Sequence, residues 1–136
     1  MNKIPMIDVQ KAFNKAIRKR DGRCMIKDYD FCNGGLECSH FFKVSSNPTL
    51  RFYPFNAYTQ CQRHHWKHHN ISERPYIDFL LHFYPDELQY MKTVRKRCIK
   101  YSEPLKAKII ELCNSGKLIE LRDLLRNVIA GEEYEY

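Results

Sequence analysis

The chain has 136 residues, a formal net charge of +7 and 43% hydrophobic residues. This length suits one domain, and the apolar content excludes a disordered chain. The basic excess favours a polyanionic partner, nucleic acid or an anionic membrane surface, although a solvated basic face without a partner would have the same composition.

The first eight residues lack the apolar core of a signal peptide, and no apolar run is long enough to span a membrane. The sequence therefore predicts a cytoplasmic protein in a reducing compartment. Clustered cysteines in such a compartment are metal ligands more often than disulfides.

The first predicted element is a helix over residues 9–20. Apolar residues recur in it at helical spacing, Asp8 is placed to cap it, and Asp21-Gly22 ends it. The opposite face of this helix is basic, so it either contacts phosphates or is simply solvated.

Two strands are expected next. Residues 36–44 form the first, which carries His40, and residues 50–53 form the second. Asn56 lies in the connection that follows, and a short helix carries residues 61–69.

The chain is helical in character from Ser72 onward. Further helices are expected to begin near Ser72, Pro85 and Ser102, and the last follows Gly116. Cys98 and Cys113 lie on apolar stripes of these helices and are expected in the core.

Four of the six cysteines and five of the six histidines lie between the first helix and the end of the short one. Cys61-x-x-His64 has metal-ligand spacing, and Cys24 and Cys32 can add two thiolates from a separate arm. Three thiolates and one imidazole make a closed tetrahedral set for a structural Zn²⁺. The gap between Cys24 and Cys32 is wider than usual, and Cys38 is the substitute if Cys32 is not a ligand. The alternative is a group of buried cysteines beside a surface histidine.

His65 and His69 are four residues apart, so they share one face of the short helix. Two imidazoles placed this way can hold a second divalent cation, Mg²⁺, Mn²⁺ or Zn²⁺, and imidazole suits the last two better. His64 is rotated away from His65 by about 100° and can serve the other metal. The alternative for His65 and His69 is a solvated polar face.

The order His40, Asn56, His65 along strand, loop, strand and helix resembles the HNH, or ββα-metal, endonucleases. Over residues 18–71 the chain more closely resembles the phage NinG/Rap recombination nucleases and related small phage zinc HNH proteins. The segments that carry this resemblance are Leu36-Glu-Cys-Ser-His-Phe-Phe, Leu50-Arg-Phe, Asn56 and Gln60-Cys-x-x-His-His.

The resemblance implies an α+β fold. Residues 1–71 would form an N-terminal helix and a small zinc-stapled ββα-metal (HNH) core. Residues 72–136 would form a C-terminal helical region that packs on this core or makes a dimer interface.

The resemblance also implies a metal-dependent DNA endonuclease. His40 would be the general base that deprotonates the attacking water, a task that suits a neutral imidazole. His65 and His69 would hold the catalytic metal, which stabilises the leaving oxygen. Asn56 would hold the loop and orient His40.

One feature departs from the family pattern. Many members have a metal ligand just before the base, where this chain has Ser39. Glu37 is the nearest carboxylate, but strand alternation places it on the opposite face from His40. Glu37 is therefore a doubtful ligand, and a water can fill that place.

The motif does not choose between linear, branched and single-stranded DNA, but the resemblance implies branched DNA such as Holliday junctions as substrate, and action in the bacterial cytosol. Symmetric cutting of two strands would favour a homodimer, with the helices after residue 72 as its interface; the alternative is that these helices only cover their own core. The alternative is a non-catalytic zinc module that binds nucleic acid or a protein and does not need His40. A zinc hydrolase of small substrates fits less well, because no Glu accompanies the paired histidines as a base.

Overall fold

The computed structural model describes residues 2–131, which form an α+β fold with six α-helices and one two-stranded antiparallel sheet. The predicted fold class is therefore confirmed. The strands are β1 (Leu36–His40) and β2 (Ala57–Cys61). The helices are α1 (Met6–Asp21), α2 (Gln62–Asn70), α3 (Arg74–Phe83), α4 (Pro85–Val94), α5 (Glu103–Asn114) and α6 (Leu118–Ile129).

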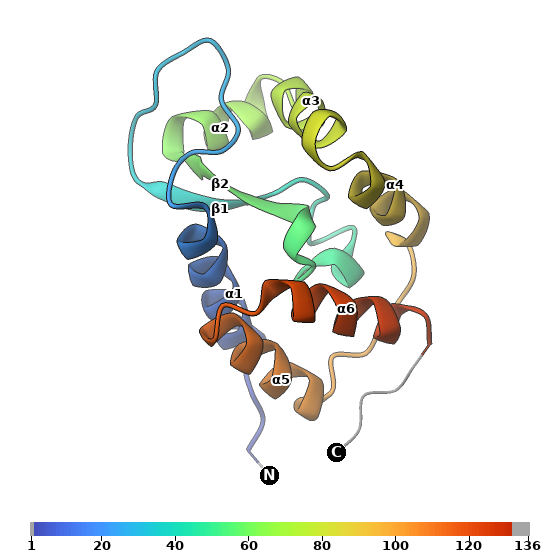
Figure 1. Ribbon diagram of the computed structural model, residues 1–136. Coiled ribbons are helices and arrows are strands. Elements are labelled where there is room, and N and C mark those ends of the chain that lie inside the picture. The colour runs from blue at the N-terminus through green and yellow to red at the C-terminus, as the bar shows by residue number, and fades with distance from the viewer. Residues whose placement is uncertain (1, 132–136) are drawn as a thin grey trace.

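The sheet lies between two groups of helices (Figure 1). Helices α1, α5 and α6 lie on one side of it, and α2, α3 and α4 lie on the other. Helix α2 follows β2 without a loop, so β1, β2 and α2 form a ββα unit. In the described part of the chain, no helix is both long and apolar enough to cross a membrane.

The second strand differs from the prediction. Residues 50–53 form no strand but follow a 3₁₀ turn, Pro48–Leu50, and precede another, Pro54–Asn56. A proline begins each turn, where its fixed φ and missing N–H are tolerated. Phe52 and Tyr53 are both fully buried, whereas a strand with one solvated face would bury only one of two neighbours. The strand is Ala57–Cys61 instead, and β1 ends at His40 because the chain then turns into this loop.

Helix α1 begins three residues earlier than predicted, after Pro5, and Asp8 lies in its first turn rather than at its cap. The predicted apolar face is confirmed, because its four residues are all buried. Gly22 ends the helix with φ of 69°, a left-handed conformation that glycine adopts without strain. The buried residues are Val9, Phe13, Ala16 and Ile17.

One hydrophobic core runs from Val9 in α1 to Ile129 in α6 and takes in the loop between the strands. Cys113 is buried in it, as predicted. Cys98 is exposed, so its expected core position is wrong. The reason is that α4 ends at Val94, and the helical stripe does not continue to Cys98.

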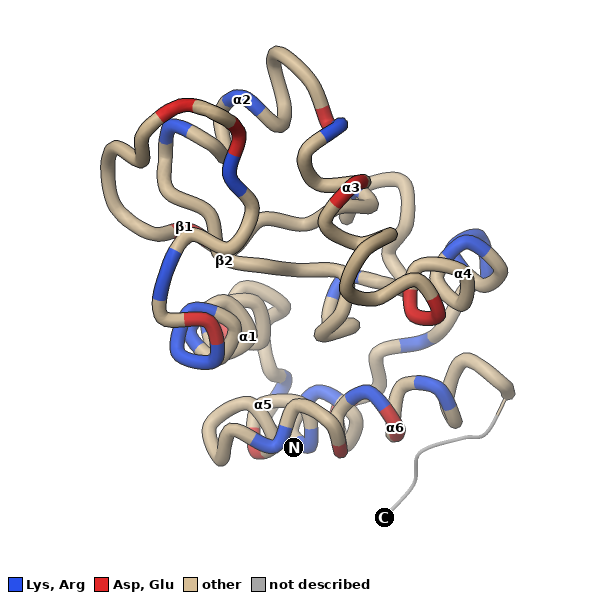
Figure 2. Tube along the Cα trace, turned by 45° about the horizontal axis from the view of Figure 1, so that its top comes forward, with Lys and Arg blue, Asp and Glu red and all other residues tan. Residues whose placement is uncertain are grey.

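Positive charge is not confined to one element. Figure 2 shows Lys and Arg along α1, beside α2, on α4 and on the last two helices. The net charge of +7 is therefore spread over several faces.

Candidate functional site

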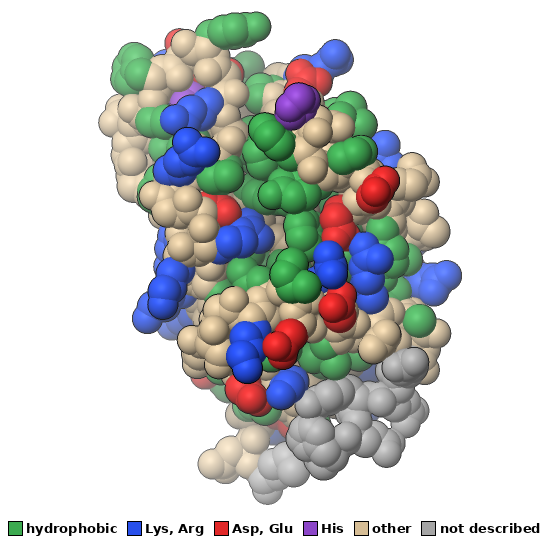
Figure 3. All heavy atoms as spheres, viewed as in Figure 1, with side chains coloured by type: hydrophobic (Ala, Val, Ile, Leu, Met, Phe, Trp, Pro, Cys, Tyr) green, Lys and Arg blue, Asp and Glu red, His purple; other side chains and the backbone are tan. Residues whose placement is uncertain are grey.

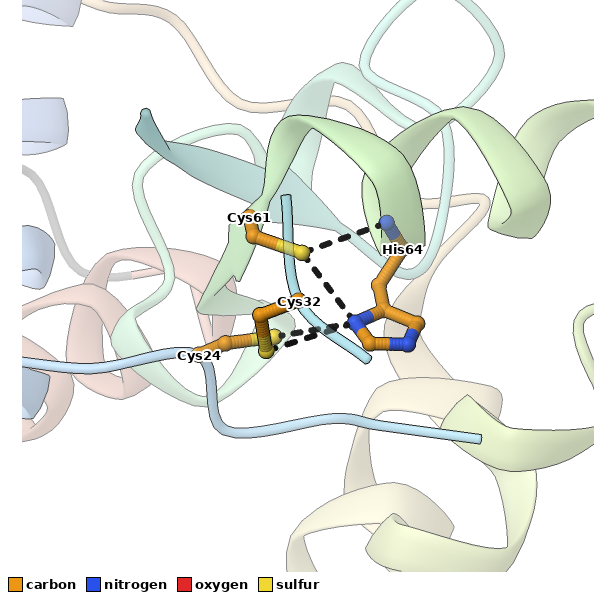
Figure 4. Close-up of side chains that lie close together, drawn as sticks. All are labelled: Cys24, Cys32, Cys61 and His64. Carbon is orange, nitrogen blue, oxygen red and sulfur yellow. Dashed lines mark hydrogen bonds between the residues drawn. The ribbon is translucent and has the colours of Figure 1, made fainter. Parts of the chain in front are cut away.

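Cys24, Cys32, Cys61 and His64 point toward one another from a loop and from the start of α2 (Figure 4). Their ligand atoms all lie within 4.8 Å of one another. The Nδ1 atom of His64 lies 3.6, 3.7 and 3.1 Å from the sulfurs of Cys24, Cys32 and Cys61. In a tetrahedral zinc site with Zn–N of about 2.0 Å and Zn–S of about 2.3 Å, this separation would be about 3.5 Å. The predicted ligand set is thus assembled and can hold a zinc ion.

Local structure explains this convergence. The cysteine loop, residues 22–35, folds over the start of α2, where the backbone N–H of Arg63 donates to the carbonyl of Asn33 at 3.1 Å. Cys61 is the last residue of β2, and its sulfur accepts the backbone N–H of His64 at 3.4 Å. A metal bound here would join the cysteine loop to the junction of β2 and α2.

The thiols differ in acidity. Burial raises the pKa of Cys24 to about 12. Burial also acts to raise the pKa of Cys61, but hydrogen bonds from the backbone at His64 and Asn33 outweigh it and lower the pKa to about 7. Cys61 is therefore more easily deprotonated than Cys24 as a metal enters.

Asp28 completes this site and was missed by sequence reasoning. Its Oδ1 lies 2.9 Å from Nε2 of His64, and Lys67 donates to its Oδ2 at 2.8 Å. The hydrogen bond from Lys67 is the main cause that lowers the pKa of Asp28 to about 2. A carboxylate on the far nitrogen keeps the proton there and turns the Nδ1 lone pair toward the metal position. The one sequence signal was its place between two ligand cysteines.

A second group of side chains lies on another side of α2. The Nε2 atoms of His65 and His69 are 3.1 Å apart, and Nδ1 of His65 lies 3.0 Å from Oε1 of Glu37. Two nitrogens about 2.1 Å from one cation and about 90° apart would have nearly this separation. Glu37, the doubtful ligand, thus lies where a carboxylate orients a ligating imidazole. Within residues 2–131, however, only the three cysteines and His64 form a tight group of three or more candidate ligands.

His40 ends β1, and its ring stacks on Phe13 with centroids 5.7 Å apart. Its Nε2–H donates to the carbonyl of Arg51 at 3.0 Å, which leaves the lone pair on Nδ1. Burial lowers the pKa of His40 to about 4, although the Arg51 carbonyl acts in the opposite direction. His40 is therefore neutral at pH 7.

Asn56 is fully buried and closes the loop that carries Arg51. Its Oδ1 accepts the N–H of Phe42 at 2.9 Å, and its Nδ2 donates to the carbonyls of Phe42 and Leu50 at 3.1 and 3.2 Å. The two hydrogen bonds with Phe42 join the two ends of the loop between β1 and β2.

A groove of about 510 Å³ borders His69. Lys43 and Arg95 line it together with one carboxylate, Glu73, so its wall carries a net positive charge close to the His65–His69 pair. No hydrogen bond in the described residues joins His40 to that pair, although the charge of His65 contributes to the low pKa of His40.

Of the comparisons with known proteins, the one with protein families gives a match. Neither the curated proteins nor the solved structures include a match to this chain. The family model described as the bacteriophage lambda NinG protein matches residues 5–81, which include both strands, α2, the cysteine cluster, His40, Asn56 and the His65–His69 pair. Because the match covers more than half of the chain, this protein belongs to the NinG family.

Proposed function

We propose that the chain is an HNH-type, metal-dependent DNA endonuclease. The observation that carries the proposal is the pair of imidazoles, His65 and His69, whose Nε2 atoms lie 3.1 Å apart. Neither histidine belongs to the hydrophobic core, and Glu37 holds the other nitrogen of His65. Two accessible imidazoles oriented in this way are better placed to bind a divalent cation than to stabilise the hydrophobic core.

Each residue of the proposed site would have its own role in the hydrolysis. Nδ1 of His40 accepts the proton of a water that attacks a phosphodiester, and Asn56 and the Arg51 carbonyl keep its ring in place. The P–O3′ bond breaks and leaves a 5′-phosphate and a 3′-hydroxyl. A divalent cation on His65 and His69 would stabilise the phosphate and the departing oxygen. Lys43 and Arg95 in the adjacent groove would contact neighbouring phosphates.

The family supports a proposal for the substrate. NinG proteins belong to phage recombination, which supports branched DNA such as Holliday junctions as the substrate. Symmetric cutting of a junction needs two active sites, so a homodimer is the expected active form.

The test is cleavage of a labelled four-way junction and a matched linear duplex, with Mg²⁺ or Mn²⁺ and then with chelator. We expect His40→Ala to lose cleavage by about 10²- to 10⁴-fold and to keep binding. His65→Ala with His69→Ala should also abolish cutting. His82→Ala is the matched control, because His82 is an exposed histidine on α3.

Binding without cutting under every metal would contradict the proposal. It would favour the alternative, a non-catalytic module that binds zinc through Cys24, Cys32, Cys61 and His64.

A further inference from the structure

Three large aromatic side chains are exposed around the cysteine loop. Tyr29 and Phe31 lie on the loop and are 109% and 69% exposed, and Trp66 on α2 is 58% exposed. Figure 3 shows apolar side chains protruding over this loop, at the upper left of the molecule. A single exposed aromatic residue needs no explanation, but three around one small loop do.

Arg63 connects the loop to the helix. Its guanidinium lies 4.8 Å from the centre of the Phe31 ring and also contacts Asp30 at 3.2 Å. Arg63 and Trp66 are three residues apart on α2, so they are neighbours on its surface. We call Tyr29, Phe31, Arg63 and Trp66 the aromatic platform.

A hollow of about 470 Å³ lies beside Arg63 and Trp66, within the size range of small-molecule sites. Gly34 forms part of its wall with φ of 84°, and a Cβ there would lie 2.4 Å from the side-chain oxygen of Gln62. A larger residue at position 34 would thus disturb the wall, so glycine suits both the backbone and the space.

The charge around the platform suits a polyanion. Four basic side chains accompany two carboxylates, and Lys67 bridges both of these carboxylates while Arg63 contacts one of them. The surroundings therefore remain positive. The basic residues are Arg23, Lys27, Arg63 and Lys67, and the carboxylates are Asp28 and Asp30.

The platform borders the proposed cleavage site. On α2, Trp66 lies three residues before His69, so these two positions are neighbours on the helix surface. A strand with its phosphate at the pair would thus have its neighbouring base within reach of Trp66.

We propose that the aromatic platform stacks on unpaired nucleobases and so selects single-stranded or branched DNA over duplex. Aromatic and guanidinium planes bind the faces of bases, which are accessible at a branch point but covered by neighbours in a duplex. The inference rests on the proposed function for the nature of the substrate, and it assigns the selectivity to these four residues.

Trp66 is the single tryptophan of the chain, so its fluorescence reports on the platform directly. The full-length, zinc-loaded protein is titrated, without added Mg²⁺ or Mn²⁺, with oligo(dT), with a four-way junction that has an unpaired bubble at its centre, and with a fully paired duplex. We expect strong quenching by the first two and weak quenching by the duplex.

Affinity for oligo(dT), measured by anisotropy, should fall about 5- to 100-fold in Trp66→Ala and in Phe31→Ala. Trp66→Phe should retain most of it, because a phenyl ring still stacks. Phe83→Ala, which removes an exposed aromatic ring on α3, should change nothing. The zinc content of each variant shows that the cysteine loop is intact.

Equal quenching by oligo(dT) and duplex, or unchanged affinity in both alanine variants, would overturn the proposal and leave the platform as a surface for a protein partner. The experiments distinguish failure of the platform proposal from failure of the nuclease proposal. A chain that cuts junctions without quenching refutes the platform alone, and quenching without cutting refutes the nuclease alone.

Discussion

Helices α2 and α6 are held in place by different physical means. Four leucine and isoleucine side chains of α6 are buried, so this helix is fixed by ordinary apolar packing. The one buried residue of α2 is His64, which belongs to the cysteine cluster. A helix that is anchored at one end by the cysteine cluster does not need a long apolar face, and α2 can therefore present histidines on its surface.

The contrast agrees with the place of the proposed site in this fold. The apolar stripes of α3 to α6 serve the core. The ββα unit carries the polar groups, and its geometry depends on the cysteine loop. We expect the two regions to respond to different perturbations.

Loss of the metal should have the largest effect. Cys61→Ser removes a sulfur that also accepts the His64 N–H, so the variant should lose its zinc and the cysteine loop and α2 should unfold. Structural zinc contributes about 10–16 kcal/mol in zinc-finger peptides, so a loss of several kcal/mol is expected. Metal analysis and hydrogen exchange of α2 against α6 would measure it. Cys98→Ser, at an exposed cysteine, is the control, and retention of zinc by Cys61→Ser would refute the ligand set.

A cavity in the helical region should have the next largest effect. Leu121 is fully buried in α6, and Leu121→Ala should lower the free energy of unfolding by about 2–5 kcal/mol in urea. The zinc content should stay the same. Ile119→Ala, on the exposed side of the same helix, should cost less than about 0.5 kcal/mol. If Leu121→Ala also released the metal, the two regions would not be held independently.

The same contrast explains what the sequence could predict. The stripes of α1 and α6 repeat at helical spacing because one side faces the core, so their positions were correct. Strand β2 is buried at all five positions and includes Thr59 and Gln60, so it has no alternation to detect. The apolar residues at 50–53 were mistaken for it. The ligand spacing revealed the cysteine cluster, but Asp28 and the Arg51 carbonyl act through contacts that leave no pattern in the sequence.

The smallest expected effect is the pH dependence of the free energy of unfolding. It should arise in the ββα unit, because the buried face of α6 has no titratable side chain. Burial holds the pKa of His40 at about 4, below its ordinary 6.5. As the pH falls, the His40 imidazole therefore becomes protonated in the unfolded chain before it does so in the folded protein. The free energy of unfolding should be highest above pH 6.5 and should fall between pH 6.5 and 4, by at most about 3 kcal/mol. Urea unfolding at pH 7.5, 6 and 5 should show a decline in wild type that is shallower in His40→Asn. The two proteins differ only at position 40, so parallel curves would mean that His40 is not held neutral by the fold.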